Sequence, residues 1–293
     1  MARTRQRRAG GGGRSGGREA VAEPVGGGLA RLTPDPDRAD GWELSLDGAP
    51  QSHVDLAEPT RLAFAYQRRL GHLADLAAPP GRPVNALHLG GGGLTLARYV
   101  AVTRPRSTQQ VAEPDERLTA LVRRALPLPP GARVRIRAVD AREALGRIAD
   151  GWADLIITDV FDGTRTPAHC ASAEFLDEAR RVLRPGGWYA ANLTDGPPLA
   201  HLRGQAATAL SRFAAVGLAA DPAVLRGRRF GNGILCASDR ALPADELTRR
   251  FARDPHAARL LTGRDLVDFT AGAPVVTDAT AVASPLPPAG TFG

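Results

Sequence analysis

From residue 84 onward the chain alternates between short apolar runs and longer amphipathic segments. The apolar runs predict strands at 84–89, 108–112, 133–139, 153–158, 188–193, 222–226 and 232–238. The amphipathic segments predict helices at 94–102, 115–126, 141–149, 172–183 and 199–215. Such alternation is typical of a doubly wound, Rossmann-like α/β sheet, in which ligands bind outside the carboxyl ends of the parallel strands.

The residues before this region have a different pattern. Residues 41–55 alternate apolar and polar side chains around an Asp47-Gly48 turn, which predicts a β-hairpin, and residues 59–76 have the spacing of an amphipathic helix. We therefore expect a hairpin-and-helix cap at 41–80, followed by the nucleoside-binding catalytic domain at 81–262. Residues 1–40 are rich in Gly and Arg and predict a disordered tail, and residues 263–293 are weakly patterned and predict a loose C-terminal segment.

Charge and composition exclude several kinds of function. The first 31 residues contribute +5 of the net charge of +7, so the body is nearly neutral and is not expected to bind nucleic acid. All 38 basic residues are arginines, which excludes Schiff-base lysine chemistry. No run approaches the ~18 apolar residues of a membrane span, and the basic start of the chain lacks an apolar signal core, so we expect a cytoplasmic protein. Cys170 and Cys236 lie far apart and match no metal-ligand spacing, so no metal is expected.

Four consecutive glycines follow the strand predicted at 84–89. A strand, a Gly-rich turn and a helix in that order offer backbone N–H groups to a nucleotide, because glycine allows positive φ and its missing Cβ lets a ligand approach. The alternative is a flexible loop. Context favours a binding site, because Glu113 follows the next strand, where an acidic residue would bind the ribose diol.

The predicted parallel strands end in glycine or carboxylate residues. Gly90–Gly93 follow the first strand, Glu113 the second and Asp140 the third, and the fourth is followed by Asp159 and Asp162. An acidic residue at such a position can simply cap the next helix, and for Asp140 alone that alternative is equally good. Because the carboxyl ends of parallel strands meet at one edge of the sheet, we expect these side chains to share one crevice.

At these motifs the chain resembles the spermidine synthase (polyamine aminopropyltransferase) family of the Rossmann-like S-adenosylmethionine-dependent methyltransferase superfamily. The resemblance covers residues 46–238. Its motifs are LDGAPQ (46–51), HLGGGG (88–93), VAEPDERL (111–118), VDA (139–141), DLIITDVFDG (154–163) and RVLRPGG (181–187). The first and fifth are the more specific, whereas the last occurs in many methyltransferases.

The resemblance implies an enzyme that binds decarboxylated S-adenosylmethionine and transfers its aminopropyl group to a small amine, and it implies a homodimer. By this resemblance, Gly90, Gly91 and Gly92 would contact the methionine-derived part of the cofactor, and Glu113 would bind the ribose. Asp140 and Ala141 would contact the adenine, and Gln51 would close over the nucleoside. Asp159 would be the general base, and Asp162 would hold the aminopropyl amine.

Several departures from the family leave the acceptor open. Gly93 stands where the family has a polyamine-binding Asp, residues 56–64 lack its Tyr-His pair, and Asn192 stands where Gln is usual. Two alternatives therefore remain, a methyltransferase that uses intact S-adenosylmethionine on a small molecule and a non-catalytic nucleoside-binding module. Asp162 favours the decarboxylated cofactor, because it would repel the carboxylate of the intact one. Among the histidines, we expect His88 to be a core residue, and His169 is the one to test for a role in the site.

Overall fold

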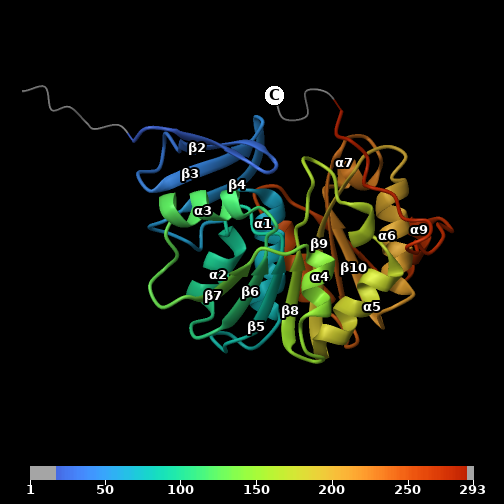
Figure 1. Ribbon diagram of the computed structural model, residues 1–293. Coiled ribbons are helices and arrows are strands. Elements are labelled where there is room, and N and C mark those ends of the chain that lie inside the picture. The colour runs from blue at the N-terminus through green and yellow to red at the C-terminus, as the bar shows by residue number, and fades with distance from the viewer. Residues whose placement is uncertain (1–17, 289–293) are drawn as a thin grey trace, which may run out of the picture.

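The computed structural model describes residues 18–288, which form a central eight-stranded sheet and a separate four-stranded sheet (Figure 1). In spatial order, the central strands are β12 (Arg259–Thr262), β10 (Ala215–Ala220), β11 (Gly231–Ser238), β9 (Leu183–Asp195), β8 (Ala153–Thr158), β5 (Asn85–Leu89), β6 (Thr108–Ala112) and β7 (Arg133–Arg137). From β9 to β7 the neighbours run parallel, and β11, β10 and β12 add antiparallel pairs. The predicted α/β class with a mostly parallel sheet is confirmed.

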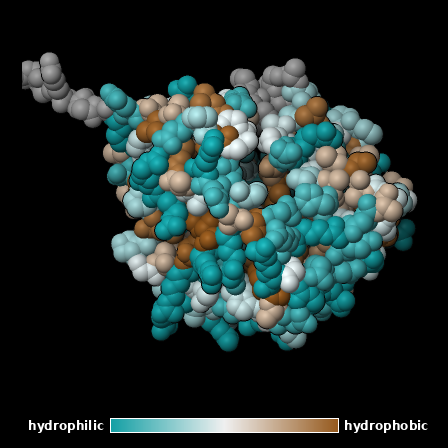
Figure 2. Space-filling model, in the orientation of Figure 1, coloured by the Kyte–Doolittle hydropathy of each residue, from teal (hydrophilic) through white to brown (hydrophobic). Residues whose placement is uncertain are grey.

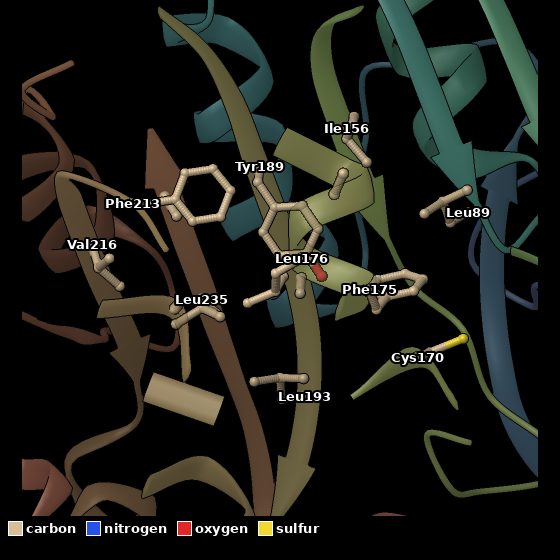
Figure 3. Packing of buried hydrophobic residues seen from close by; sticks show 14 of the residues in the cluster. Leu89, Ile156, Cys170, Phe175, Leu176, Tyr189, Leu193, Phe213, Val216 and Leu235 are labelled. Carbon is tan, nitrogen blue, oxygen red and sulfur yellow. The ribbon is translucent and has the colours of Figure 1, made fainter. Parts of the chain in front are cut away.

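Helices cover both faces of the central sheet. They are α1 (Ala65–Leu76), α2 (Thr95–Thr103), α3 (Glu116–Ala125), α4 (Ala141–Gly146), α5 (Ala173–Val182), α6 (Ala200–Leu210), α7 (Pro222–Leu225), α8 (Ala244–Arg253) and α9 (Gly263–Thr270), with one 3₁₀ turn at Ala168–Cys170. Side chains of α4, α5, α6 and α9 form the core on one face, where Tyr189 stacks on Phe213 (Figure 3). Helices α1, α2 and α8 form the core on the other face.

Strand β8 shows why the middle of a central strand is apolar on both faces. All six of its residues are buried, with Ile156 in the first core and Leu155 and Ile157 in the second. A parallel strand covered by helices on both faces needs apolar side chains wherever it packs against them. The carboxylate within β8, Asp154, is near the start of the strand, where it accepts from the Asn85 amide and pairs with Arg184. Asp159, the first residue after β8, is the carboxylate that this strand presents at its carboxyl end.

The expectation of a disordered tail through residue 40 is wrong for the described part of that segment. Strands β1 (Val21–Val25) and β2 (Gly28–Pro34) pair with β3 (Gly41–Leu46) and β4 (Ala49–Asp55) in an antiparallel sheet. In β2 only Ala30 and Leu32 are fully buried, and they pack in a core shared with α2 and α3. Because two buried apolar residues stand among glycines and arginines, the sequence shows no clear strand pattern here. Residues 1–17 of the predicted tail lie outside the described residues.

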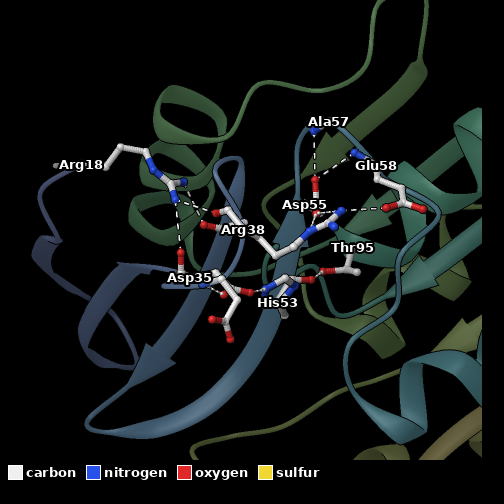
Figure 4. A network of polar contacts seen from close by, with 10 residues as sticks. Arg18, Asp35, Arg38, His53, Asp55, Ala57, Glu58 and Thr95 are labelled. Atoms are coloured by element: carbon white, nitrogen blue, oxygen red, sulfur yellow. Dashed lines mark hydrogen bonds and ion pairs between the residues drawn. The ribbon is translucent and has the colours of Figure 1, made fainter. Parts of the chain in front are cut away.

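Polar contacts join the start of the described chain to this sheet (Figure 4). The Arg18 guanidinium donates to the carbonyl oxygens of Asp35, Arg38 and Gly41. Arg38 in turn pairs with the buried Asp55 at 2.9 Å. The four strands are therefore one unit, and the predicted hairpin at 41–55 is its inner half.

Two C-terminal expectations also need correction. Residues 222–226, predicted as a strand, form α7, because Asp221 caps the amide of Ala223 at 2.7 Å and Pro222 begins the helix. The described part of 263–293 is not loose, since it contains α9 and a fully buried Ser284. The Ser284 amide donates to the Thr166 carbonyl, and its hydroxyl accepts from the Thr166 amide at 2.8 Å. Residues 289–293 lie outside the described residues.

Between residues 18 and 288, no helix is long and apolar enough to cross a membrane.

Candidate active site

A cavity of about 1040 Å³ lies at the carboxyl edge of the parallel strands, with β3, β4 and the start of α1 on its other side. All nine site residues predicted from the sequence line it: Gln51, Gly90, Gly91, Gly92, Glu113, Asp140, Ala141, Asp159 and Asp162. The face of the molecule in Figure 2 is mostly hydrophilic, with hydrophobic residues appearing in its middle, between the N-terminal sheet and the C-terminal helices. The predicted shared crevice exists, whereas the individual roles stay predictions.

The glycine loop has the positive φ angles that its sequence predicts. Gly90 has φ +93°, and a Cβ there would lie 2.1 Å from the carbonyl oxygen of Asp159. Glycine is therefore the residue that lets β5 and β8 approach each other at the floor of the cavity. Gly92 also has positive φ, at +44°.

The amides of this loop already have partners within the protein. Gly91 and Gly92 donate to Oε2 of Glu113 at 2.9 and 3.2 Å, and Gly93 donates to the Ser52 hydroxyl at 3.2 Å. The other carboxylate oxygen of Glu113 accepts the amide of Asp115 at 3.0 Å. The expectation of free N–H donors is thus not met at these three glycines. A loop whose amides are neutralised by a carboxylate suits an uncharged ribose better than a phosphate.

Asp140 caps a helix and also lines the cavity, so the cap does not exclude the predicted binding role. Its side chain caps α4 by accepting the amide of Arg142 at 2.8 Å, and it lines the cavity. Oδ2 also pairs with Nε2 of His169 at 2.8 Å. Burial raises the pKa of Asp140, but the His169 and helix-amide hydrogen bonds outweigh it, and the net pKa is lowered. Asp140 is therefore a fixed anion, and the buried Ala141 beside it leaves room in the cavity.

His169 belongs to a group that the sequence spacing did not reveal. Ligand atoms of Asp140, His169 and Cys170 lie within 4.8 Å of one another, and among residues 18–288 they form the one such group of three that could hold a metal ion. The Asp140 carboxylate is already engaged by His169 and by the start of α4, and burial raises the pKa of the Cys170 thiol to about 12. His169 therefore lies beside Asp140, the residue for which the resemblance implies contact with the adenine.

Asp159 lies at the centre of the cavity wall. Burial raises its pKa to about 6, although the hydrogen bond from Asn192 and the nearby Tyr66 hydroxyl lower it. Nδ2 of Asn192 donates to Oδ1 of Asp159 at 2.9 Å, and Nδ2 of Asn232 donates to Oδ1 of Asn192 at 2.9 Å. The carboxylate is thus oriented by a chain of amides from β9 and β11, and its pKa suits a group that accepts a proton near neutral pH.

Tyr66 is the main residue that the sequence reasoning missed. It lines the cavity two residues beyond the stretch searched for the family's tyrosine, and its hydroxyl donates to the carbonyl of Gln51 at 2.9 Å. Burial, and then the negative charge of Asp159, raise the pKa of its phenol, so Tyr66 stays a neutral donor. Asn232 was missed as well, since an antiparallel strand arriving beside β9 leaves no local signal in the sequence.

Asp162 and Gly93 are the two remaining positions that bear on the acceptor. Asp162 is exposed at the rim, in a turn closed by backbone hydrogen bonds with Arg165. At Gly93 a Cβ would lie 2.9 Å from Cβ of Ser52 and 3.2 Å from Cγ2 of Val54. Strand β4 therefore fills the space that the side chain of an Asp would need, and the departure at Gly93 belongs to the packing of this protein.

His88 is a core residue, as predicted. It is 4% exposed, its Nε2 lies 2.8 Å from Oε1 of Gln109, and burial lowers its pKa to about 4. A neutral, hydrogen-bonded imidazole on a buried strand stabilises the sheet next to the site.

Comparison with known proteins identifies the family. No protein-family model matches the sequence. The crystal structure of a probable spermidine synthase from Corynebacterium glutamicum is similar over 89% of this chain and 97% of its own, with TM-score 0.83 and 33% identity. The polyamine aminopropyltransferase of Vibrio vulnificus is 30% identical over 134 residues, which are 45% of this chain and 44% of that protein.

A spermidine synthase solved in complex with the transition state analogue AdoDATO has TM-score 0.59 and 16% identity, covers 86% of this chain and 83% of its own, and supports the fold alone. The chain spans about half the length of the curated relatives it matches. On the strength of the Corynebacterium match, the protein belongs to the spermidine synthase family, whose fold is that of the Rossmann-like methyltransferases.

Proposed function

We propose that this protein is an aminopropyltransferase that binds decarboxylated S-adenosylmethionine and transfers its aminopropyl group to a small amine. The single observation that carries this proposal is the location of Asp159. Its strand, β8, lies between the strands that carry the predicted nucleoside residues (β5, β6 and β7) and the strands β9 and β11 on the other side. A base at that boundary can reach the proton of an amine that approaches a cofactor bound over β5–β7.

The residues present fit such a cofactor. The cavity is large enough for a nucleoside, and the Glu113 carboxylate, fixed by the amides of Gly91 and Asp115, can accept hydrogen bonds from a ribose diol on its remaining lone pairs. Asp140 can accept from the adenine amino group. When bound, the cofactor supplies an electrophilic carbon next to a positively charged sulfur, which leaves as a neutral thioether.

The chemistry required of the protein is deprotonation of the acceptor. An alkylammonium has no lone pair to attack with, so it must first give a proton to Asp159, whose pKa of about 6 leaves it largely ionised at neutral pH. The positive charge next to the ammonium lowers the pKa of that group, which eases the proton transfer. Asp162 is placed to hold a terminal ammonium of the donor.

The test is to incubate the protein with decarboxylated S-adenosylmethionine and a panel of amines, and to measure methylthioadenosine by chromatography. We expect amine-dependent methylthioadenosine formation from the decarboxylated cofactor and weaker binding of intact S-adenosylmethionine in calorimetry. Tight binding of the intact cofactor, with methyl transfer and no methylthioadenosine, would overturn the proposal. Binding of methylthioadenosine without turnover of any amine would instead indicate a non-catalytic module.

A further inference from the structure

The half of the cavity beyond Asp159 differs in its lining residues from the half beside the glycine loop. On that side the lining comes from β9, from the loop that leads into β11, and from the start of α1. Gly231 of β11 pairs with Asp195 of β9, so the start of β11 lies at the same sheet edge as Asp159. Arg229 and Phe230 directly precede this strand, and His256 adds a further side chain.

Carboxylates are concentrated on the opposite half. The acidic residues that line the cavity, among those described, are Glu113, Asp115, Asp140, Asp159 and Asp162. Three of them are committed: Glu113 to the glycine loop, Asp115 to the first amides of α3 and to Gly27, and Asp140 to α4 and His169. Asp159, whose Oδ1 accepts from Asn192, and Asp162 are the two that we expect to meet an ammonium, and both follow β8.

The wall beyond β9 is basic and aromatic. Arg229 and His256 line it together with Phe64, Tyr66 and Phe230. Behind it lies Arg69, which is 3% exposed, donates to the His256 carbonyl at 3.2 Å, and has no hydrogen-bond partner for Nε among the described residues. Two carboxylates lie close by: Asp221 pairs with Arg229 at 2.7 Å, and Asp254 pairs with His72 at 2.9 Å. Neither of these carboxylates lines the cavity.

We infer that the acceptor is a primary amine that carries a carboxylate on the same short chain, in place of a second ammonium. Its amine would meet Asp159 and its carboxylate would meet Arg229, whose guanidinium has N–H donors beyond the one used by Asp221. The strand axes of β8 and β11 are about 10 Å apart, a distance that a four-carbon chain and an arginine side chain together span. A diamine of that length would bring its distal ammonium to the Arg229–Asp221 pair, of which Arg229, the like charge, is the member that lines the cavity.

This inference rests on the proposed aminopropyl transfer for its reaction, but it can be tested through binding as well. Three probes share a four-carbon chain: 4-aminobutanoate, 1-aminobutane and 1,4-diaminobutane. Calorimetry on the complex with methylthioadenosine gives their affinities, and methylthioadenosine release from decarboxylated S-adenosylmethionine gives kcat/KM. We expect 4-aminobutanoate to exceed 1,4-diaminobutane by at least about tenfold in both measurements, with 1-aminobutane between them.

Arg229→Glu is the diagnostic variant, and Arg228→Glu is its control, because Arg228 is exposed and does not line the cavity. Arg229→Glu should reverse the order of the two charged probes, and Arg228→Glu should preserve it. The inference is overturned if wild type prefers the diamine, if none of the three probes binds, or if Arg229→Glu keeps the wild-type order. Should the binding order hold without any methylthioadenosine release, the proposed transfer fails while the inferred amine–carboxylate site stands.

Discussion

Asn192 donates a hydrogen bond to Asp159 at 2.9 Å while it accepts one from Asn232 at 2.9 Å. The amide orientation is therefore fixed from behind, and only its N–H can face the carboxylate. Because this hydrogen bond favours the ionised form, Asn192 lowers the pKa of Asp159 against the effect of burial. The residue that departs from the family pattern at this position thus acts directly on the proposed base.

The first prediction concerns the pH dependence of turnover. With a pKa of about 6, Asp159 must lose its proton before it can act as a base, so kcat/KM should rise with pH through about 6. Asn192→Leu removes a hydrogen bond that lowers this pKa, so the same limb should move to higher pH. Stopped assays between pH 5 and 8 measure both curves. An unshifted limb in Asn192→Leu would show that a different group controls the rate.

Replacement of Asp159 itself should separate chemistry from binding. Asp159→Asn keeps the size of the side chain but cannot accept the proton, so turnover should fall by ~10²–10⁴. The affinity for methylthioadenosine should change much less, because the predicted nucleoside residues lie on other strands. Undiminished turnover in this variant would exclude Asp159 as the base.

The same variant should be more stable than wild type at neutral pH. The folded-state pKa of Asp159 lies above its usual value of 3.8, so its ionisation lowers the free energy of unfolding as pH rises from about 4 to about 6. The neutral amide in Asp159→Asn has no such cost, and at about 1.36 kcal/mol per pKa unit the gain at pH 7 should reach about 1–3 kcal/mol. Urea unfolding at pH 4 and pH 7 tests this, since the advantage of the variant should shrink at the lower pH. A constant difference would place its cause outside the titration of Asp159.

The sequence predicted the central sheet and the crevice because both depend on local patterns. Apolar runs such as residues 155–157 in β8 mark strands buried on both faces, and the residues that follow such runs mark one sheet edge. The sequence could not predict contacts that arise from tertiary packing. Asn232 reaches the site through an antiparallel strand, Tyr66 faces Asp159 from the cap, and Ala30 and Leu32 are too few to mark β2 as a strand. The homodimer implied by the family stays a prediction.

Glu113 should control nucleoside affinity. Glu113→Ala removes a charge-assisted hydrogen bond to the ribose and also frees the amides of Gly91 and Gly92, so the Kd for methylthioadenosine should rise roughly 10- to 150-fold, which corresponds to about 1.5–3 kcal/mol. Glu116→Ala is the matched control, because Glu116 is an exposed carboxylate at the start of α3 outside the cavity. Equal affinity in the two variants would contradict the assigned role of Glu113.

Removal of residues from the N-terminus should show which part of the N-terminal segment the fold needs for stability. A chain that begins at residue 18 keeps every described contact and should melt like the full chain. A chain that begins at residue 39 loses β1 and β2, and with them the buried Leu32 and the pair between Arg38 and Asp55. The core shared with α2 and α3 then opens to water, next to the helix that follows the glycine loop, so both stability and nucleoside affinity should fall.

Leu32→Ala in the full chain provides a milder test of the same core, in case the chain that begins at residue 39 does not fold. Removal of this buried side chain alone should cost about 2–5 kcal/mol. Melting temperature and methylthioadenosine affinity, measured on all three proteins, should fall for the residue-39 chain and for Leu32→Ala but not for the residue-18 chain. Equal melting of the residue-18 and residue-39 chains would mean that the outer half of this sheet contributes nothing to stability.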